Sequence, residues 1–445
     1  MPANAPMDYA SRWTTSAKSA DGNGQRLVLS FLVAYLVLIV LCSFALRAKD
    51  VMVGGGELNY DRALFLSVST ATLTGFQQSI GFNDFNPESA KGPAILLILT
   101  IAGSLFAMIA GSLAAVRVLR LPFSDHQVIN AALTAELLAV LAGTAVICGA
   151  SFNDPHGVRL PDAIHQAACA LGNSAAVMTS KGHTFKPFNS FIAQGVLLPL
   201  SILGGFGLPV LMELYHRLVR PTWRLSKHCR SVIVLSAGVY LAATVLLMCA
   251  APRQSDAASE NPSPAVVSNS GSAAGEWRDS FVTASTMAIN TRTAGLPFDT
   301  LKHYSHAGQW LLVLLMMIGA NSAGTAGGIK LTTFLVLIAG FRNVLLGRPV
   351  SRVFGIAGVW LGAYLLIAIA SFLVLSILEP QMPADGGVFL IISALSNVGM
   401  SHDPVSIVGK GSYLLSGIML IGRLAPLAVL WWMAGTTSDA EVLVA

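Results

Sequence analysis

The sequence predicts an all-α integral membrane protein, and three observations predict it. Hydrophobic residues make up 54% of the 445 residues and charged residues only 11%, whereas a soluble domain carries about a quarter charged residues. The apolar residues gather in runs of about 20, the length that crosses a hydrocarbon core of about 30 Å. These runs form a pattern that recurs four times. The chain is therefore expected to cross a bilayer repeatedly.

Long apolar runs are the candidate membrane spans. Between the members of each successive pair lies a less apolar segment, too short to cross, that suits a re-entrant helix. The spans are expected at 27–46, 93–116, 128–150, 190–212, 230–250, 308–338, 353–378 and 411–434, and the short helices at 61–74, 160–173, 277–290 and 385–396. A fourfold repeat indicates an architecture more firmly than any single span.

The repeat divides the chain into a tail and four units of span, short helix, loop and span. The tail is polar and lacks the apolar core and cleavage site of a signal peptide, so we expect it to be loose. The predicted bounds are 1–26 for the N-terminal tail, 27–120 for repeat A, 121–220 for repeat B, 221–345 for repeat C and 346–445 for repeat D.

The basic residues indicate how the spans are oriented. The net charge is +5, and Lys and Arg gather in short loops beside the spans, as the positive-inside rule describes. This placement predicts that the loops carrying Arg117, Arg220 and Arg348 are cytoplasmic, together with both termini. It also argues against nucleic-acid binding. The five cysteines form no CxxC pair, so neither a disulfide framework nor a zinc site is expected.

The loops after the four short helices are built of small and hydroxylic residues. Glycine permits backbone conformations barred to other residues, so successive carbonyls can face a shared axis. Four such loops would make rings of carbonyl oxygens that replace the hydration shell of a cation, and the negative C-terminal ends of the short helices would favour that cation. In register, the loops read Thr72-Leu73-Thr74-Gly75, Gly172-Asn173-Ser174-Ala175, Arg292-Thr293-Ala294-Gly295 and Ser396-Asn397-Val398-Gly399. We call them filter loops A to D.

A further unusual segment, 318–330, interrupts the apolar run from Trp310 to Ile338; we call it the intramembrane loop. Backbone groups freed at that depth need a cavity or protein partners, and a lysine there is costly unless it is paired or hydrated. A simple kink is the competing interpretation, but the pattern favours a moving pore element. The residues that indicate it are Gly319, Asn321, Ser322, Gly324, Thr325, Gly327, Gly328 and Lys330.

At these loops the chain resembles the Trk/Ktr/HKT superfamily of potassium transporters, most of all the Ktr-type membrane subunit. The most specific segments are 291–295, 324–330 and 421–427, which read TRTAG, GTAGGIK and IGRLAPL. The resemblance covers nearly the whole chain. It implies four membrane–pore–membrane units around one central pore, pseudo-fourfold and K+-channel-like. It also implies that filter carbonyls select K+, without a cofactor, and that the intramembrane loop gates the pore with Arg423.

The resemblance also implies partners and a location. Ktr and Trk subunits form homodimers on a cytosolic nucleotide-binding ring of RCK type, which here would dock on the basic inner loops as a separate subunit. The chain would then take up potassium across the inner cell membrane, embedded in the lipid bilayer.

One filter position departs from the pattern, because Ala175 stands where filter loop B should carry glycine. Alanine adopts a positive φ at a cost of about 1–2 kcal/mol, or the strand turns its carbonyl elsewhere. In HKT relatives, serine in place of a filter glycine accompanies sodium permeation, although in the first filter loop. Sodium or mixed Na+/K+ permeation is therefore the alternative.

Three kinds of charged or titratable residue need an account. Glu136, about two turns inside its span, is expected to neutralise Lys330 or Arg423 and so to help hold the intramembrane loop as part of the gate, or else to reach the inner interface beside Arg120. Arg292 is expected to bond backbone carbonyls, or an acid such as Asp279 or Asp299. The outer histidines share no ligand spacing and are expected to be solvated; they are His165, His303, His306 and His402.

Two other classes compete with a channel-like pore. A secondary transporter with inverted repeats also uses broken helices, but all four repeats here begin and end on the same side. An intramembrane hydrolase is faintly suggested by Gly149-Ala150-Ser151, yet no histidine is paired with it. Because the sequence contains no P-loop or nucleotide fingerprint, we expect no enzymatic activity.

Overall fold

The described part of the chain is helical. Apart from helices, it has only two isolated bridges, Met52 with Phe85 and Ile318 with Ile329. The all-α fold predicted from the sequence is confirmed. The computed structural model describes residues 9–52, 56–76, 85–86, 89–150, 158–174, 192–250, 273–294, 304–321, 323–402 and 405–436.

Repeats A and D have the same simple plan of a long helix, a short helix and an unbroken second long helix. The elements of repeat A are α1 (Tyr9–Ala45), α2 (Tyr60–Ala71) and α3 (Lys91–Val118). Those of repeat D are α12 (Arg352–Leu378), α13 (Ala384–Leu395) and α14 (Lys410–Thr436).

The first helix begins earlier than the sequence indicated. The apolar span Arg26–Ala45 starts where expected, but α1 already begins at Tyr9, inside the segment expected to be a loose tail. Once a helix is nucleated, each further residue adds a hydrogen bond at little cost, so the span extends its own helix outward.

Repeats B and C instead have second helices that break. Repeat B comprises α4 (Asp125–Ala150), α5 (Leu160–Gly172), a π-helical turn η2 (Ala193–Leu197), α6 (Leu198–Phe206) and α7 (Leu208–Val219). Repeat C comprises α8 (Lys227–Ala250), α9 (Ala273–Ile289), a second π-helical turn η5 (Asn290–Ala294), α10 (His306–Met317) and α11 (Leu331–Leu345).

The span expected at 190–212 is not one continuous helix. Between α6 and α7 the chain bends by 102° at Gly207, whose φ is +84°. Pro209 follows and has no N–H to continue the helix. The interruption expected within 308–338 is present, because the intramembrane loop separates α10 from α11. Six described helices are long and apolar enough to cross a membrane, or seven if the bent pair is one span.

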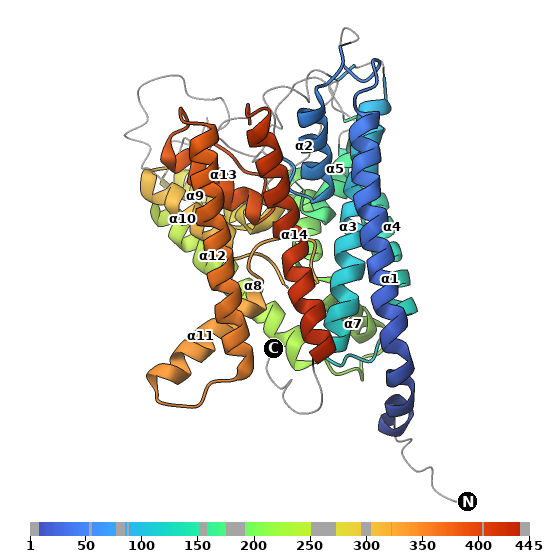
Figure 1. Ribbon diagram of the computed structural model, residues 1–445. Coiled ribbons are helices and arrows are strands. Elements are labelled where there is room, and N and C mark those ends of the chain that lie inside the picture. Colours follow the sequence, from blue (N-terminus) through green and yellow to red (C-terminus); the bar gives the residue numbers. More distant parts are fainter. Residues whose placement is uncertain are drawn as a thin grey trace, which may run out of the picture.

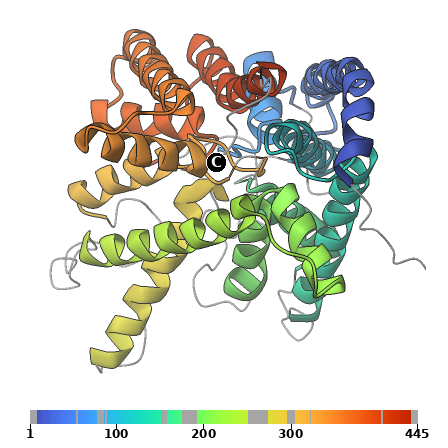
Figure 2. The same cartoon turned by 90° about the horizontal axis from the view of Figure 1, so that it is seen from below.

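The four repeats follow one another around a common centre, as the colour sequence in Figure 2 shows. Neighbouring repeats pack through α3 with α4, α6 with α9, α10 with α13, and α14 with α2, which closes the ring. The four short helices α2, α5, α9 and α13 lie in the same half of the molecule, the upper half in Figure 1. The start of α1 and the end of α14 lie at the opposite side.

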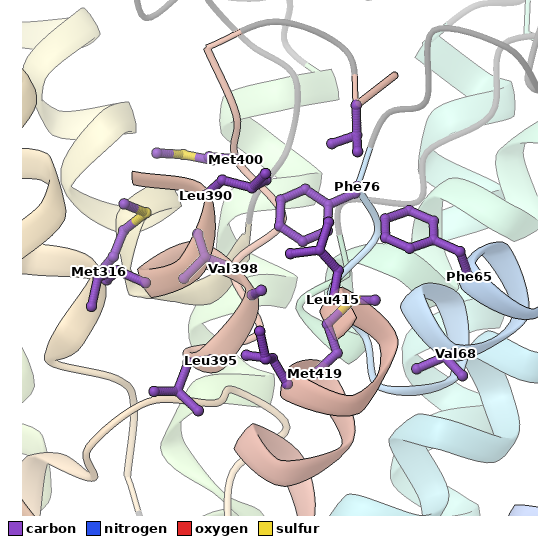
Figure 3. Close-up of a cluster of buried hydrophobic side chains, with 14 of the residues drawn as sticks. Phe65, Val68, Phe76, Met316, Leu390, Leu395, Val398, Met400, Leu415 and Met419 are labelled. Atoms are coloured by element: carbon purple, nitrogen blue, oxygen red, sulfur yellow. The ribbon is translucent and has the colours of Figure 1, made fainter. Parts of the chain in front are cut away.

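The largest apolar core lies between repeats and not inside one of them. Figure 3 shows side chains from α2, α10, α13 and α14 meeting there, including Phe65, Met316, Leu395 and Met419. Outward-facing residues are also apolar; Leu366 is 72% exposed and Ile377 79%. A surface of this kind is suited to hydrocarbon, so burial between repeats and lipid contact together account for the high apolar content. The protein is a multi-pass membrane protein.

Candidate functional site

Filter loops A, B and D begin with the same backbone turn. Leu73, Asn173 and Asn397 have left-handed φ values of +62°, +54° and +52°. In each loop the N–H of that residue bonds the carbonyl three positions back, and the next N–H bonds the carbonyl five positions back, at 2.9 Å in all three. This pair of bonds is the Schellman ending of a helix. The register read from the sequence is therefore present in the backbone of three repeats.

The glycines expected in these loops also have unusual backbone conformations. Gly75 and Gly399 have φ values of +72° and +84°, a region that favours glycine because it has no Cβ. Thr72, Thr74, Ser174, Ser396 and Val398 are buried within the same turns. Ala175 and Gly295 lie outside the described residues.

Filter loop C differs from the other three. After α9 the chain continues as the π-helical turn η5, which contains Arg292, Thr293 and Ala294. The Thr291 hydroxyl donates to the Ala288 carbonyl at 3.3 Å. Sequence register alone gave no signal for this wider turn.

Each Schellman turn rests on a glycine of the second helix in its own repeat. A Cβ added to Gly103, Gly204 or Gly422 would overlap the carbonyl oxygen of Ala71, Leu171 or Leu395, respectively. Those three carbonyls occupy equivalent positions, since each lies two residues before the left-handed residue. These glycines are not among the predicted site residues, although the sequence carries a signal for them. An apolar residue followed by glycine recurs as Ala102-Gly103, Leu203-Gly204, Ile318-Gly319 and Ile421-Gly422.

The intramembrane loop is buried against the break in repeat B. The Asn321 N–H donates to the Gly205 carbonyl and the Thr325 N–H to the Gly204 carbonyl, both at 3.2 Å. The Asn321 side-chain amide also donates to Gly205, at 3.3 Å. In a continuous helix the Gly205 carbonyl would bond the N–H of residue 209, which is a proline. The break in α6–α7 therefore supplies the acceptors that this loop needs.

The same loop contacts the ends of α5 and α13. The Thr325 hydroxyl donates to the Leu171 carbonyl at 3.1 Å and accepts from the Asn173 amide at 2.8 Å. On the other side, Gly327 packs so closely on the Ser396 carbonyl that a Cβ would overlap it. The loop returns on itself through a bond from the Gly319 N–H to the Ile329 carbonyl at 3.0 Å, and Gly328, beside Gly319, has a φ of +70°. Gly324 is buried near the Gly205 carbonyl, and Ser322 lies outside the described residues.

Three cationic side chains bind backbone carbonyls around this loop. Arg423 of α14 donates to the Thr72 carbonyl at 2.9 Å and to the Thr325 carbonyl at 2.5 Å, so it ties filter loop A to the intramembrane loop. Lys330 donates to the Ala326 carbonyl at 2.5 Å. Arg292 donates to the carbonyls of Gly319 at 3.3 Å and Ser236 at 3.5 Å. This is the first of the two roles expected for Arg292; the Asp279 side chain and Asp299 are outside the described residues.

The expected partners of Glu136 are wrong. Its carboxyl group lies against Ser104 of α3, with Oε2 2.5 Å from the serine hydroxyl, and none of the ion pairs among the described residues joins it to Lys330 or Arg423. Lys330 and Arg423 instead donate hydrogen bonds to backbone carbonyls, because the broken helices leave carbonyls available beside them. His165 is also not solvated as expected: it is 4% exposed and packs within α5 beside Cys169.

Within the described residues, the site has no cluster of three metal-ligating side chains. The C-terminal ends of the short helices, which carry partial negative charge, meet near one loop of backbone that is neither helix nor strand. Irregular backbone at membrane depth occurs where it lines a cavity or packs on protein. The fold and the site together define a helical membrane transporter with a pore.

The comparisons with known proteins confirm the resemblance to Trk/Ktr membrane subunits. No family model matches the chain. Potassium/sodium uptake protein NtpJ of Enterococcus hirae is 23% identical over 442 residues, 92% of each chain. Ktr system potassium uptake protein B of Vibrio alginolyticus is 26% identical over 262 residues, 56% of this chain and only 52% of that protein. The matched region thus spans about half the length of this relative.

A shorter match and a structural match agree with these. The Ktr system potassium uptake protein B of Bacillus subtilis is 30% identical over 161 residues, 34% of this chain and 36% of the relative. The crystal structure of the potassium transporter TrkH from Vibrio parahaemolyticus superposes with a TM-score of 0.65 at 17% identity, covering 91% of this chain and 84% of that one. At this identity the structural match shows the shared fold.

Proposed function

We propose that this chain takes up potassium across the cytoplasmic membrane, through a filter of backbone carbonyls that is gated by the intramembrane loop. The filter consists of loops A to D, and the gate consists of residues 318–330 with Arg423. In this proposal the chain itself carries no enzymatic activity. The relatives named above as potassium or potassium/sodium uptake proteins support the ion, and the TrkH-like fold supports the architecture.

The observation that carries the proposal is the position of Thr325. Its hydroxyl bonds the last turn of α5, while its carbonyl accepts a hydrogen bond from Arg423, which also binds the Thr72 carbonyl of filter loop A. One buried residue of the intramembrane loop is thereby joined to two filter loops from different repeats. A loop in that position blocks the axis when it is seated, and opening requires these bonds to break.

Mixed Na+/K+ permeation is the second candidate. The relative matched over 92% of its length is named a potassium/sodium uptake protein, and Ala175 replaces the glycine expected in filter loop B. A loop that cannot place its carbonyl as the other three do would hold a dehydrated cation less selectively.

The proposal extends to orientation and partners. The basic loops around Arg117, Arg220 and Arg348 would face the cytosol, with both termini on that side of the inner membrane. The chain would form a homodimer and bind a separate cytosolic RCK-type subunit. These statements rest on the family resemblance and on the charge pattern.

Uptake into a potassium-transport-deficient bacterial strain tests the function. The strain would express the wild type, Gly399→Ala as a filter variant, and Gly417→Ala as a control, because Gly417 has no atom within 4 Å of an added Cβ. Rubidium and sodium uptake are measured separately. We expect wild type and Gly417→Ala to restore rubidium uptake and Gly399→Ala to lose it. Absence of both rubidium and sodium uptake from well-expressed wild type would overturn the proposal, whereas sodium uptake alone would favour the second candidate.

A further inference from the structure

Glu136 is buried without a cationic partner. The residue is 5% exposed, its Oε2 lies 2.5 Å from the Ser104 hydroxyl, and its Oε1 has no hydrogen-bond partner among the described residues. A buried carboxylate normally has a cation or several donors, since an unpaired charge in a low-dielectric interior is very costly.

The charged groups on the elements packed against α4 are engaged elsewhere. Arg117 of α3 pairs with Asp125 at 2.8 Å, and Lys91 of α3 pairs with Asp50 at 2.6 Å. On α5, Asp162 pairs with Arg159, and the His165 ring lies beside the Cys169 thiol, which interacts electrostatically with Glu136 but is not a cation. On α7, Glu213 binds Ser226, Arg217 donates to the Trp223 carbonyl, and His216 stacks between Phe123 and Trp223. None of them supplies a positive charge to Glu136.

Counting hydrogens at Ser104 favours a neutral acid. A serine hydroxyl donates one hydrogen, yet Ser104 Oγ has two acceptors in range, Glu136 Oε2 at 2.5 Å and the Ile101 carbonyl at 3.3 Å. If Glu136 carries a proton, the acid donates to Ser104 and Ser104 donates to Ile101, so both bonds form. If Glu136 is ionised, Ser104 has only one hydrogen for two acceptors. The Ile101 carbonyl or the carboxylate then goes without it, and at most one donor stabilises the charge.

Glu213 provides the contrast within the same molecule. It is equally buried, at 2% exposed, but both of its oxygens accept: Oε2 from the Ser226 N–H and Oε1 from the Ser226 hydroxyl, each at 2.7 Å. A backbone N–H and a hydroxyl both directed at a carboxylate stabilise its charged form. The two buried acids of the described chain thus differ in their donors: Glu213 accepts two hydrogen bonds, whereas Glu136 has one shared hydroxyl.

The Glu136–Ser104 pair lies directly behind two filter loops. Ser104 follows Gly103, which packs on the Ala71 carbonyl below filter loop A. The Ser104 Cβ lies 3.5 Å from the position of a Cβ on Gly172, the first residue of filter loop B. A change in the distance between α4 and α3 is therefore transmitted to the backbone of both loops.

We propose that Glu136 is a proton-binding site that is occupied at neutral pH, and that its proton holds α4 against α3 behind filter loops A and B. Loss of the proton in alkaline medium leaves a buried charge that must draw in water. Hydration would separate the two helices and remove the support behind Gly172. Ion flux then falls as the pH rises. This inference rests on the proposed uptake function only for its flux readout.

Two independent measurements test the proton-binding site, one of protonation and one of ion flux. Infrared spectroscopy of the purified protein detects the carbonyl stretch of a protonated carboxylic acid. We expect that band at neutral pH in the wild type, its decrease in alkaline medium, its loss in Glu136→Gln and its retention in Glu213→Gln. Rubidium flux into liposomes gives the second readout: the ratio of alkaline to neutral flux should rise in Glu136→Gln to near one, and Gly417→Ala should keep the wild-type ratio.

The outcomes that overturn the inference are specific. If the band stays intact in Glu136→Gln, Glu136 carries no proton. If the flux ratio in Glu136→Gln equals that of the wild type, protonation of this residue has no influence on the filter. If no protein transports rubidium, the proposed function fails while the infrared result still decides the protonation state. If Glu136→Gln does not fold, the alkaline titration of the wild-type band decides it.

Discussion

Repeats A and D cross with unbroken second helices, α3 and α14, whereas the second helices of repeats B and C break, and the two breaks complete each other. The carbonyls of Gly204 and Gly205, left free where α6 ends, accept the N–H groups of Thr325 and Asn321 from the intramembrane loop. Each buried polar group left without a partner would cost about 1–3 kcal/mol. A helix break at membrane depth is therefore tolerated when a second break supplies its hydrogen-bond partners.

The intact repeats A and D still share one contact with the broken repeat B, the glycine beneath each Schellman turn. This contact distinguishes what three repeats have in common from what the breaks in B and C add. Substitutions at these positions test that distinction, and their expected effects decrease in the order given.

Gly204→Ala should have the largest effect. Its Cβ would overlap the Leu171 carbonyl and lie 2.8 Å from the Asn173 amide and 2.9 Å from the Thr325 hydroxyl, so overpacking should cost about 3 kcal/mol. Thermal unfolding in detergent measures it. Gly103→Ala and Gly422→Ala should lose a comparable amount if the contact is common to all three repeats. Gly417→Ala, in open space within α14, should be neutral or slightly stabilising; equal stability of Gly204→Ala and Gly417→Ala would refute the shared contact.

Thr325→Val should loosen the intramembrane loop without disturbing the intact repeats. The change removes the hydroxyl between the Leu171 carbonyl and the Asn173 amide and leaves both buried, which should cost about 1–3 kcal/mol. Hydrogen exchange should rise in residues 318–330 but not in α3 or α14. Thr325→Ser keeps the hydroxyl and serves as the matched control. Uniform exchange across all repeats in Thr325→Val would contradict a local role.

Gly207→Ala should cost less, because only the bend in repeat B is affected. The Gly207 φ and ψ of +84° and +147° lie in a region almost reserved for glycine, and a substituted residue there is strained by about 1–3 kcal/mol. The unfolding temperature should fall relative to Gly238→Ala, in which the added Cβ meets open space within α8. An unchanged unfolding temperature would mean that the bend tolerates other conformations.

Lys91→Met should have the smallest effect. Lys91 and Asp50 join the start of α3 to the turn after α1, but their side chains are 60% and 68% exposed, and such pairs contribute little. The hydrogen bond and the charge of Lys91 hold the pKa of Asp50 below its usual value. The pair therefore stabilises above the unfolded-state pKa of Asp50 and loses that contribution as the pH falls through the lowered value. The slight gap in unfolding temperature between wild type and Lys91→Met should close in acid; a gap that persists there would assign the effect to packing.

The sequence predicted the regular parts of this fold because hydropathy and length are local properties. The short helices were expected at 61–74, 160–173, 277–290 and 385–396, and the structure has them at Tyr60–Ala71, Leu160–Gly172, Ala273–Ile289 and Ala384–Leu395. The bend at Gly207 was not predicted because its neighbours Phe206 and Leu208 are as apolar as the residues of any span. Hydropathy therefore masked the helix-breaking effect of Pro209.

The site was predicted less completely because its contacts join distant repeats. The sequence located filter loops A, B and D in register, yet nothing local indicates that Leu73, a residue without the permissiveness of glycine, has a left-handed φ. The partners of Glu136 and Arg423 come from other helices, 32 and 351 positions away. The glycines at 103, 204 and 422 could have been found by aligning the second helices as the loops were aligned.

The pairing of two breaks has a consequence for what an open gate contains. If the intramembrane loop withdraws as proposed, the carbonyls of Gly204 and Gly205 lose their protein donors, and Arg423 loses its bond to the Thr325 carbonyl while it can keep that to Thr72. In the absence of other protein groups, solvent must replace the lost partners. Opening of the gate would therefore also hydrate the space that the loop has vacated. An ion leaving the filter would regain its hydration shell there.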